Sequence, residues 1–426
     1  MANAHNALSD AQRDGVRPSI TCRSCGAELT TTFVDLGMAA LANSYVPPGG
    51  LLAPEVTYPL HVFVCSECLL VQLPAVTSAE SIFADYAYFS SYSDSWLDHA
   101  RRYVEATSER FGIGAQHQVV EIASNDGYLL QYFRDRGVPV LGVEPAANVA
   151  EAARAIGIPT VVRFFGEESA KELRGEGTRA DLLIGNNVLA HVPDLNDFVA
   201  GLAVLLAPDG LITMEFPHLL RLMAETQFDT IYHEHFSYFS LFAVERVFAS
   251  HGLELFDVEQ IPTHGGSLRI YVQHADGGRE RSPRVAALRD EEAAAGLHDL
   301  AGYAAFADQA KRTKLSVLEF VLQAKREGKR VAAYGAAAKG NTLLSYCGVG
   351  SDLIDFVVDR SPHKQGLYLP GTHIPIRAPE VVDELRPDYL LILPWNLKAE
   401  IMEQMAHVRA FGCRFVTPVP EVRVYG

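Results

Sequence analysis

Short apolar stretches alternate with helically patterned segments through the middle of the chain. The stretches that favour strands are residues 118–124, 139–145, 158–164, 180–188, 210–217, 253–261 and 267–275. Amphipathic helical spacing separates the first five. Because helical crossovers join parallel strands, this pattern predicts a parallel sheet whose binding site lies at the carboxyl ends of its strands. The last two stretches are close in sequence, which favours an antiparallel pair at the edge.

A second, smaller strand–helix alternation occupies the chain after about residue 330. Residues 276–328, between the two alternations, have helical spacing and many charges, so we expect solvated connecting helices there. A further helix is expected within 86–112, ahead of the first alternation. The pattern predicts an α/β protein of three parts, with boundaries at 1–80, 81–278 and 279–426. The last part combines the connecting helices with the smaller α/β domain.

Four of the six cysteines form two CxxC pairs near the amino terminus: Cys22, Cys25, Cys65 and Cys68. Four thiolates in two such knuckles are typical of a tetrahedral zinc site with no open coordination position. The surrounding sequence is punctuated by Pro and Gly, and small regions with little core commonly rely on a metal. We therefore expect a structural zinc ion, with a redox or disulfide role as the alternative.

Composition and charge exclude several classes of function. The 426 residues carry a formal net charge of −16, which argues against a general binder of nucleic acid or of membrane surfaces. No apolar run approaches the roughly 18 residues needed to span a bilayer, and the polar first residues do not resemble a signal peptide. We expect a cytoplasmic protein, and nothing in the sequence argues beyond a monomer.

The first two predicted strands end in acidic residues that are suited to a nucleoside ligand. Glu144 ends the second strand, where a carboxylate can accept both ribose hydroxyls. The turn after the first strand lacks GxGxxG, which favours a ligand with ribose but no phosphates, such as S-adenosylmethionine (SAM). Simple helix capping by Glu144 is the alternative. The residues expected to bind SAM are Glu121, Ala123, Asn125, Asp126, Glu144, Pro145, Phe164, Asn186 and Asn187.

A series of motifs in fixed order is shared with a known family. The order is CxxC, CxxC, "YFSSYS", "EIASNDG", "GVEP", "NNVLAHVPD", "EFP", "YHEHFSYFS", "GGSLRIYV" and "YGAAAKGNTLL". From about residue 20 onward the chain resembles the SAM-dependent deoxysugar C-methyltransferases of antibiotic biosynthesis, which act on dTDP-linked 4-keto-6-deoxyhexoses. The resemblance implies an N-terminal zinc module, a class I SAM-methyltransferase domain of the Rossmann-like type, and a smaller C-terminal Rossmann-like domain that helps to hold the nucleotide sugar.

The segment "YHEHFSYFS" concentrates the chemistry expected of such an enzyme. Carbon methylation beside a ketone requires removal of a weakly acidic proton, and an imidazole can act as the base near neutral pH. The resemblance implies that His235 is this base. It also implies that Tyr232, Glu234 and Tyr88 shape the sugar site. His191, after the fourth predicted strand, is expected to contact the substrate there, with helix capping as the alternative. A metal site shared by His233 and His235 is one alternative, and a structural role for His233 alone is another.

Two further groups of residues are expected near the substrate. Glu215 ends the fifth strand, and "THGGSLRI" supplies His264 and Arg269, the latter as a partner for a phosphate or an acid. In the C-terminal domain, small residues before a helix could cradle an anion together with Lys339. The absence of P-loop or GxGxxG spacing disfavours NAD, whereas the diphosphate of a dTDP-sugar fits. The expected substrate-binding residues are Tyr334, Lys339, Asn341, Arg360, His363, Lys364 and Trp395.

These expectations combine into one predicted function. The chain should be an enzyme that methylates a carbon, C-3 by preference, of a dTDP-linked 4-keto-deoxysugar with SAM as the methyl donor. Methylation at C-5, methylation of oxygen or nitrogen on a related nucleotide sugar, and an inactive zinc- or SAM-binding scaffold are the alternatives. A packing role without any ligand is the alternative for the C-terminal domain.

Overall fold

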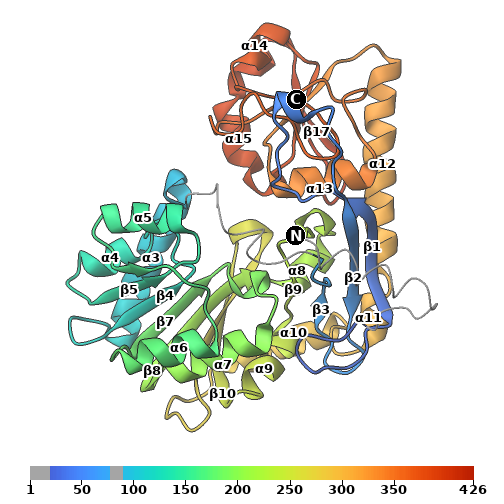
Figure 1. The fold of residues 1–426 in the computed structure, drawn as a ribbon. Helices are drawn as coiled ribbons and strands as arrows, with labels where there is room; N and C mark the ends of the chain where they lie inside the picture. Colours follow the sequence, from blue (N-terminus) through green and yellow to red (C-terminus); the bar gives the residue numbers. More distant parts are fainter. Residues whose placement is uncertain (1–19, 77–89) are drawn as a thin grey trace.

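The computed structural model describes residues 20–76 and 90–426, which form three sheets connected by helices (Figure 1). The middle seven-stranded sheet belongs to the largest part of the molecule. A four-stranded sheet lies at the amino terminus and a six-stranded sheet at the carboxyl terminus. The predicted α/β fold of three parts is confirmed. Within the described ranges, no helix is long and apolar enough to cross a membrane.

The N-terminal module is built on an antiparallel ribbon. Its strands are β1 (Thr31–Ala39), β2 (Tyr58–Val64) and β3 (Val71–Gln72), with a 3-10 turn η1 (Pro48–Gly50) between the first two. The fourth strand, β9 (Ser237–Tyr238), comes from the middle of the chain and pairs with β3. The predicted catalytic segment is therefore part of the sheet of the zinc module.

The middle sheet has the strand order β10-β11-β8-β7-β4-β5-β6. Its strands are β4 (Val119–Ile122), β5 (Val140–Val143), β6 (Thr160–Val161), β7 (Ala180–Asn186), β8 (Leu206–Pro217), β10 (Leu253–Ile261) and β11 (Ser267–His274). Strands β4 to β8 run parallel, whereas β11 is antiparallel to both β8 and β10. The predicted parallel sheet with an antiparallel pair at one edge is confirmed.

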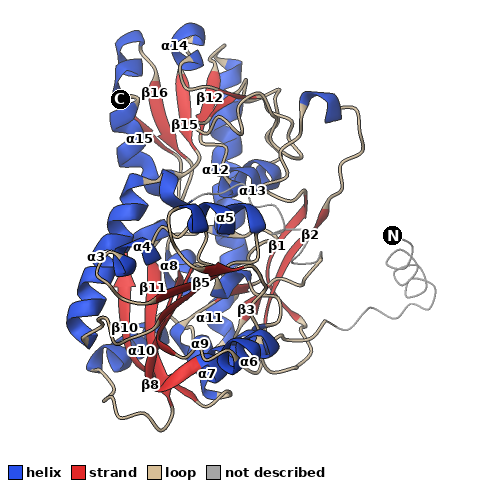
Figure 2. Ribbon diagram, turned by 60° about the vertical axis from the view of Figure 1, so that its left-hand side comes forward, coloured by secondary structure: helices blue, strands red, loops and turns tan. Residues whose placement is uncertain are grey.

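Helices cover both faces of this sheet (Figure 2). They are α3 (Asp94–Phe111), α4 (Leu130–Arg134), α5 (Ala147–Ala155), α6 (Glu167–Gly175), α7 (Leu195–Leu205) and α9 (Leu241–Ala249), with 3-10 turns η2 (Ser90–Tyr92), η3 (Leu189–His191), η4 (Phe228–Thr230) and η5 (Thr263–Gly265). Helix α8 (Leu219–Ala224) instead packs into the core shared with the N-terminal module and the C-terminal domain. Successive strand residues face opposite sides. In β7, Leu183 belongs to the core under α6 and α7, whereas Leu182 and Ile184 pack with α3 and α4.

The connecting helices are α10 (Pro283–Ala294), α11 (Leu300–Tyr303) and α12 (Phe306–Arg326). The expectation of solvated connectors is wrong for one face of each long helix, because Val285 and Leu288 of α10 and Phe306 and Val317 of α12 are buried. Figure 1 shows α12 running beside β1 toward the C-terminal domain. The ring of Phe306 stacks on that of Phe33 in β1, with centroids 4.5 Å apart. The charged residues of these helices therefore occupy the outer faces, except for Glu292 of α10, which is buried.

The C-terminal sheet has the order β14-β13-β12-β15-β16-β17 and is parallel except for β17. Its strands are β12 (Val331–Tyr334), β13 (Val357–Val358), β14 (Ile376–Arg377), β15 (Tyr389–Ile392), β16 (Arg414–Thr417) and β17 (Arg423–Tyr425). The helices are α13 (Ala338–Cys347), α14 (Val381–Leu385) and α15 (Lys398–Gln404), with 3-10 turns η6 (Trp395–Leu397) and η7 (Ala406–Phe411). Thr342 of α13 donates to the Ile231 carbonyl at 2.9 Å, which joins this domain to the segment that leads to His235.

Candidate active site and metal centre

The four knuckle cysteines converge at the base of the N-terminal module. Their sulfur atoms all lie within 4.8 Å of one another, and they form the one group of three or more metal-ligating side chains within residues 20–76 and 90–426. The Sγ atoms of Cys22 and Cys68 are 3.5 Å apart, as are those of Cys25 and Cys65. These separations are too long for disulfides and are close to the edge of about 3.8 Å of a tetrahedron with zinc–sulfur bonds of about 2.3 Å. The sulfur cluster therefore fits a zinc ion.

The turn after β4 gathers three carboxylates at the carboxyl end of the sheet. Glu121, Asp126 and Glu144 are all buried. Burial raises the pKa of Glu121 well above its usual range, and the neighbouring charges of Asp126 and Glu144 raise it further. A bound cation would relieve this repulsion, so the turn fits the positively charged end of SAM. Gly127 adopts a left-handed φ of 78°, and a Cβ there would lie 2.9 Å from Ile158, so only glycine fits.

The backbone at this turn is held in place by its own acidic and amide side chains. Glu144 accepts hydrogen bonds from the backbone N–H groups of Asn125 and Ala146, both at 2.9 Å. Asn125 and Asp126 in turn accept from the backbone N–H groups of Ser90 and Ser91 at 3.0 and 3.1 Å. Glu144 makes no cap hydrogen bond to helix α5, in contrast to the alternative interpretation, and binds the backbone of the turn instead. A carboxylate oxygen accepts more than one hydrogen bond. Ribose binding by Glu144 stays a prediction.

Beyond the turn, the remaining residues expected to bind SAM differ in exposure. Phe164 is 42% exposed, whereas its neighbour Phe165 packs edge-on against Phe198 with centroids 5.4 Å apart. Phe164 is therefore free to cover a ligand. Ala123 and Pro145 are half-buried beside the same turn.

Asn186 and Asn187 follow β7 at the neighbouring strand end. The hydroxyl of Tyr128 lies against Asn186, and Nδ2 of Asn187 donates to Nε2 of His264 at 3.2 Å. His264 is thereby brought to the strand ends, although its own segment follows β10. The structure thus brings the segments of Asn187 and His264 together. The ligands of these residues stay predictions.

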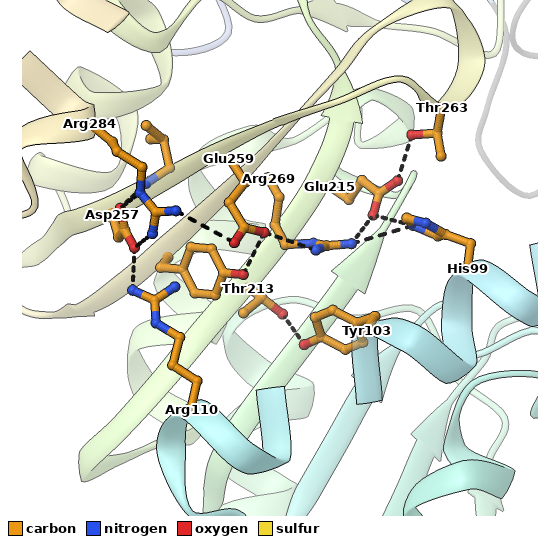
Figure 3. Close-up of polar contacts among 12 residues, drawn as sticks. His99, Tyr103, Arg110, Thr213, Glu215, Asp257, Glu259, Thr263, Arg269 and Arg284 are labelled. Atoms are coloured by element: carbon orange, nitrogen blue, oxygen red, sulfur yellow. Dashed lines mark hydrogen bonds and ion pairs between the residues drawn. The ribbon is translucent and has the colours of Figure 1, made fainter. Parts of the chain in front are cut away.

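Glu215, at the end of β8, is the centre of a polar network (Figure 3). It accepts hydrogen bonds from His99 of α3, Arg269 of β11 and Thr263 of η5, each at 2.9 Å. Burial opposes ionisation of Glu215, but these partners outweigh it and hold the pKa at about 2. Of the two partners expected for Arg269, the structure provides the acid. The network fixes η5, which carries His264, against the sheet.

The segment around His235 is buried where the three parts of the molecule meet. Nδ1 of His235 lies 2.8 Å from the Thr230 carbonyl. Because a carbonyl only accepts, Nδ1 carries the proton and Nε2 of the neutral ring is left with its lone pair. Burial lowers the pKa of His235 well below its usual range, and the neighbouring His191 adds to this shift. The ring is therefore a neutral acceptor at pH 7.

Aromatic rings surround this imidazole. The rings of Tyr232 and His191 have centroids 4.0 and 4.6 Å from that of His235. Burial lowers the pKa of His191 to about 4. Glu234 accepts from Nδ2 of Asn43 in the zinc module at 2.6 Å. The structure thus brings His235, Tyr232, Glu234 and His191 together, whereas Tyr88 lies outside the described residues.

His233 points away from His235. Its Nε2 donates to the Pro59 carbonyl of β2 at 3.2 Å, and its ring lies edge-on to Tyr58. The two imidazoles of the segment therefore do not share a metal in this structure. The structural alternative for His233 agrees with these contacts.

Lys339 projects from the C-terminal domain toward this segment. Its Nζ donates to Asn396 Oδ1 at 2.7 Å and lies 4.9 Å from the centre of the Trp395 ring. Nε1 of Trp395 donates to the buried carboxylate of Asp229 at 2.7 Å. Burial lowers the pKa of His264 to about 4 and Lys339 adds to the shift, so the ammonium acts electrostatically on His264.

The other residues expected to bind substrate fall into two groups. Arg360 lines a cavity of about 490 Å³ between α15 and the segment Tyr92–Ser95, and Tyr334 contacts Gln404 of the same cavity through its hydroxyl at 3.4 Å. Asn341 and Lys364 instead donate to backbone carbonyls, those of Ala42 at 2.5 Å and Ala336 at 2.9 Å. His363 is exposed. Nucleotide binding by this set stays a prediction.

Sequence reasoning missed four residues that contact the predicted site residues: Asn43, Trp96, His99 and Asp229. Trp96 and His99 stack with centroids 4.9 Å apart, one turn apart on α3. That aromatic–imidazole spacing was a usable signal. Asn43 lies in a turn and Asp229 in the 3-10 turn η4, and no local pattern marks them.

Comparisons with known proteins agree with this architecture. Three family models match successive parts of the chain: a putative zinc binding domain over 22–83, a methyltransferase domain over 96–258 and a C-methyltransferase C-terminal domain over 262–420. The C-methyltransferase NovU of Streptomyces niveus is 39% identical over 412 residues, which cover 97% of this chain and 98% of that protein. This chain belongs to the C-methyltransferase family. It is a SAM-dependent C-methyltransferase with an N-terminal zinc-binding domain.

More distant likenesses are confined to parts of the chain. The ubiquinone biosynthesis O-methyltransferase of Chelativorans sp. (strain BNC1) is 27% identical over 96 residues, which are 22% of this C-methyltransferase and 38% of that protein. Among solved structures, the PH0226 protein from Pyrococcus horikoshii OT3 is 16% identical with a TM-score of 0.37, and covers 46% of this chain and 97% of its own.

Proposed function

We propose that this C-methyltransferase methylates C-3 of a dTDP-linked 4-keto-6-deoxysugar, with His235 as the base that removes the C-3 proton. The orientation of His235 carries the proposal, because its Nδ1–H is committed to the Thr230 carbonyl and Nε2 remains as the acceptor. A positioned imidazole of this kind typically contributes about 10² to 10⁴ in rate. Its lowered pKa keeps the acceptor unprotonated at neutral pH.

The surroundings of His235 suit an enolate. A proton next to a ketone is removed more easily when the charge that develops on oxygen meets a cation or hydrogen-bond donors in a site that excludes water. Lys339 supplies the cation, and the rings of Tyr232 and His191 shield the base. Glu234, held by Asn43, would accept from a sugar hydroxyl. Proton removal by His235 and charge stabilisation by Lys339 act on one substrate.

The residues of the middle domain suit the methyl donor. SAM supplies an electrophilic methyl group on a sulfonium sulfur. Glu121 and Asp126 would hold its cationic end, Glu144 the ribose and Phe164 the adenine. Asn187 binds His264, and His264 senses the charge of Lys339, so the two ligands would meet near these residues. Holding both reactants in one orientation supplies much of the barrier reduction in such transfers.

The cavity between the middle and C-terminal domains suits the nucleotide. Its volume of about 490 Å³ lies within the range typical of small-molecule sites. Arg360 offers a guanidinium for phosphate at its wall. A dTDP group held there would extend its sugar toward Lys339 and His235.

Product analysis tests this function. The enzyme is incubated with dTDP-4-keto-6-deoxysugars that carry a hydroxyl, an amine or hydrogen at C-3, together with SAM labelled with ¹³C in its methyl group. We expect carbon–proton NMR correlations to place the label on C-3 of one of them. A label on C-5, oxygen or nitrogen would replace the proposed regiochemistry. Absence of any transfer by an enzyme that binds SAM would overturn the proposed substrate class.

The role of His235 is tested separately from methyl transfer. With S-adenosylhomocysteine in place of SAM and with D₂O as solvent, the wild type should exchange the C-3 proton of the sugar for deuterium. His235→Asn should lose this exchange. Exchange at the wild-type rate in the variant would overturn the assignment of the base while leaving the methyltransferase assignment intact.

A further inference from the structure

The segment that carries His235 is continuous with the sheet of the zinc module. Val71 pairs with Tyr238 and Gln72 pairs with Ser237. The Leu73 N–H donates to the Phe236 carbonyl at 3.0 Å, and the Phe236 N–H donates to the Ala190 carbonyl at 2.7 Å. The segments of His191 and His235 are therefore bonded to each other and to β3.

Arg23, between Cys22 and Cys25 in the first zinc knuckle, reaches across this junction. Its Nη1 donates to the carbonyls of Val192 and Pro193 at 3.4 and 3.2 Å, directly after His191. Its Nη2 donates to the Leu73 carbonyl. The guanidinium carbon lies 5.3 Å from the centre of the Phe236 ring, directly after His235. One side chain thus contacts residues that adjoin both imidazoles.

The other end of Arg23 is fixed to the cysteine cluster. Its backbone N–H donates to Gln72 Oε1 at 2.9 Å, and Gln72 Nε2 donates to the sulfur of Cys22 at 3.1 Å. Nδ2 of Asn196 donates to the carbonyls of Arg23 and Ser24 at 3.2 and 3.0 Å. The root of the side chain is therefore set by the geometry of the knuckle itself.

We propose that Arg23 is a positioning residue that couples the zinc knuckle to the active site by holding the His191 and His235 segments in register. The proposal assigns the zinc module a part in catalysis without contact between the metal and the substrate. It rests on the proposed role of His235 only for its effect on turnover. The coupling itself, in which the Arg23 guanidinium holds backbone carbonyls in place, does not depend on that role.

Arginine suits this task better than lysine. A guanidinium presents five N–H donors in a planar fork, whereas an ammonium presents three donors at one point. Three carbonyls from two segments can be bound together only by the fork. Because a displacement of about 1 Å at a reacting group can cost about 10²-fold in rate, loss of the fork should lower turnover far more than substrate binding.

The test compares Arg23→Gln and Arg23→Lys with the control Arg246→Gln. Arg246 is exposed and donates to the Glu67 carbonyl in the second knuckle at 3.2 Å, so it contacts the zinc module without reaching the catalytic segments. Zinc content, SAM affinity, kcat, sugar KM and amide hydrogen exchange by mass spectrometry are measured on each full-length protein.

We expect both Arg23 variants to keep their zinc and to bind SAM within twofold of the wild type. Their amides should exchange at least tenfold faster in residues 188–194 and 230–238, and not elsewhere in the middle domain. Turnover should fall about 10- to 100-fold in Arg23→Gln and less in Arg23→Lys, with sugar KM changed less than threefold. Arg246→Gln should match the wild type in all of these measurements.

Unchanged exchange in the two segments would overturn the proposal, as would loss of zinc or faster exchange throughout the chain. If Arg23→Gln does not fold, Arg23→Lys decides by the same criteria. An active His235→Asn enzyme would instead overturn the proposed base and leave the exchange result of Arg23 standing, so the two failures are distinguishable.

Discussion

The turn after β4 and the segment around His235 are built in different ways. At the turn, which we propose to bind SAM, residues close in sequence hold one another, as in the hydrogen bond from Asn125 to Glu144 over 19 positions. On the side of His235, Asn43 reaches Glu234 over 191 positions and Thr342 reaches Ile231 over 111. The turn needs only the neighbouring units of β4 and β5, whereas the segment of His235 is complete only after three parts of the chain have assembled.

The largest expected effect is confined to the assembled side. His235→Asn removes the proposed base but leaves the β4 turn untouched, so kcat should fall by about 10² to 10⁴ while SAM affinity stays within twofold. Steady-state kinetics and calorimetry with SAM measure the two quantities. His233→Asn is the matched control, because His233 faces Pro59 rather than the cleft, and its loss of turnover should stay below tenfold. Near-normal turnover of His235→Asn would contradict the assignment.

The next effect tests the local side alone. Glu144→Gln keeps the shape of the side chain but removes its charge, so SAM should bind about tenfold more weakly, which corresponds to about 1.4 kcal/mol. Calorimetry measures this change. The control is Glu151→Gln on the exposed face of α5, which should bind SAM normally. If Glu144→Gln binds SAM as tightly as the wild type, Glu144 only caps the turn.

A smaller effect is expected at the rim of the SAM site. Phe164→Ala removes an exposed ring that would cover adenine, and SAM affinity should fall about threefold because only part of the ring loses contact with water on binding. Val162→Ala, which shortens another exposed apolar side chain two residues earlier, serves as the control. Equal affinities of the two variants would place adenine elsewhere.

The smallest change concerns pH. Because burial holds the pKa of His235 well below the usual value of about 6.5, the neutral base persists as the pH falls, and kcat should change less than about twofold between pH 8 and pH 6. A solvated imidazole would lose about three-quarters of its neutral form over that range. A pH–rate profile of the intact enzyme measures this change. A fall in kcat with an apparent pKa near 6.5 would show that His235 is more solvated than in this structure.

The lowered pKa values of buried histidines also lower the free energy of unfolding in acid. For His191 and His264 the folded pKa of about 4 lies below the unfolded value of about 6.5. Protonation therefore favours the unfolded chain. This stability is complete above about pH 6.5 and is lost as the pH falls toward 4.

The sequence predicted those features that depend on residues close together in the chain. Short apolar stretches separated by helical spacing identified the strands of the middle sheet, and two CxxC pairs identified the metal cluster, because neighbours in sequence determine both. The contacts of Arg23, Asn43 and Asp229 could not be predicted this way. Each of these contacts joins two distant segments through one side chain. For example, no periodicity relates Arg23 in the first knuckle to Val192, 169 positions later. The buried faces of α10 and α12 were not predicted either, because each helix has a narrow apolar stripe among many charged residues.

The pairing of β9 with the zinc module also imposes an order on biosynthesis. The first 70 residues contain all four knuckle cysteines and can bind metal early in synthesis. Their sheet still lacks its last strand, β9. Glu234, the partner of Asn43, is synthesised 191 positions after it. At about 5 to 20 residues per second, that interval on the ribosome is about 10 to 40 s. Through that interval the module exposes the edge of β3, and a truncated chain that ends before β9 would keep it exposed.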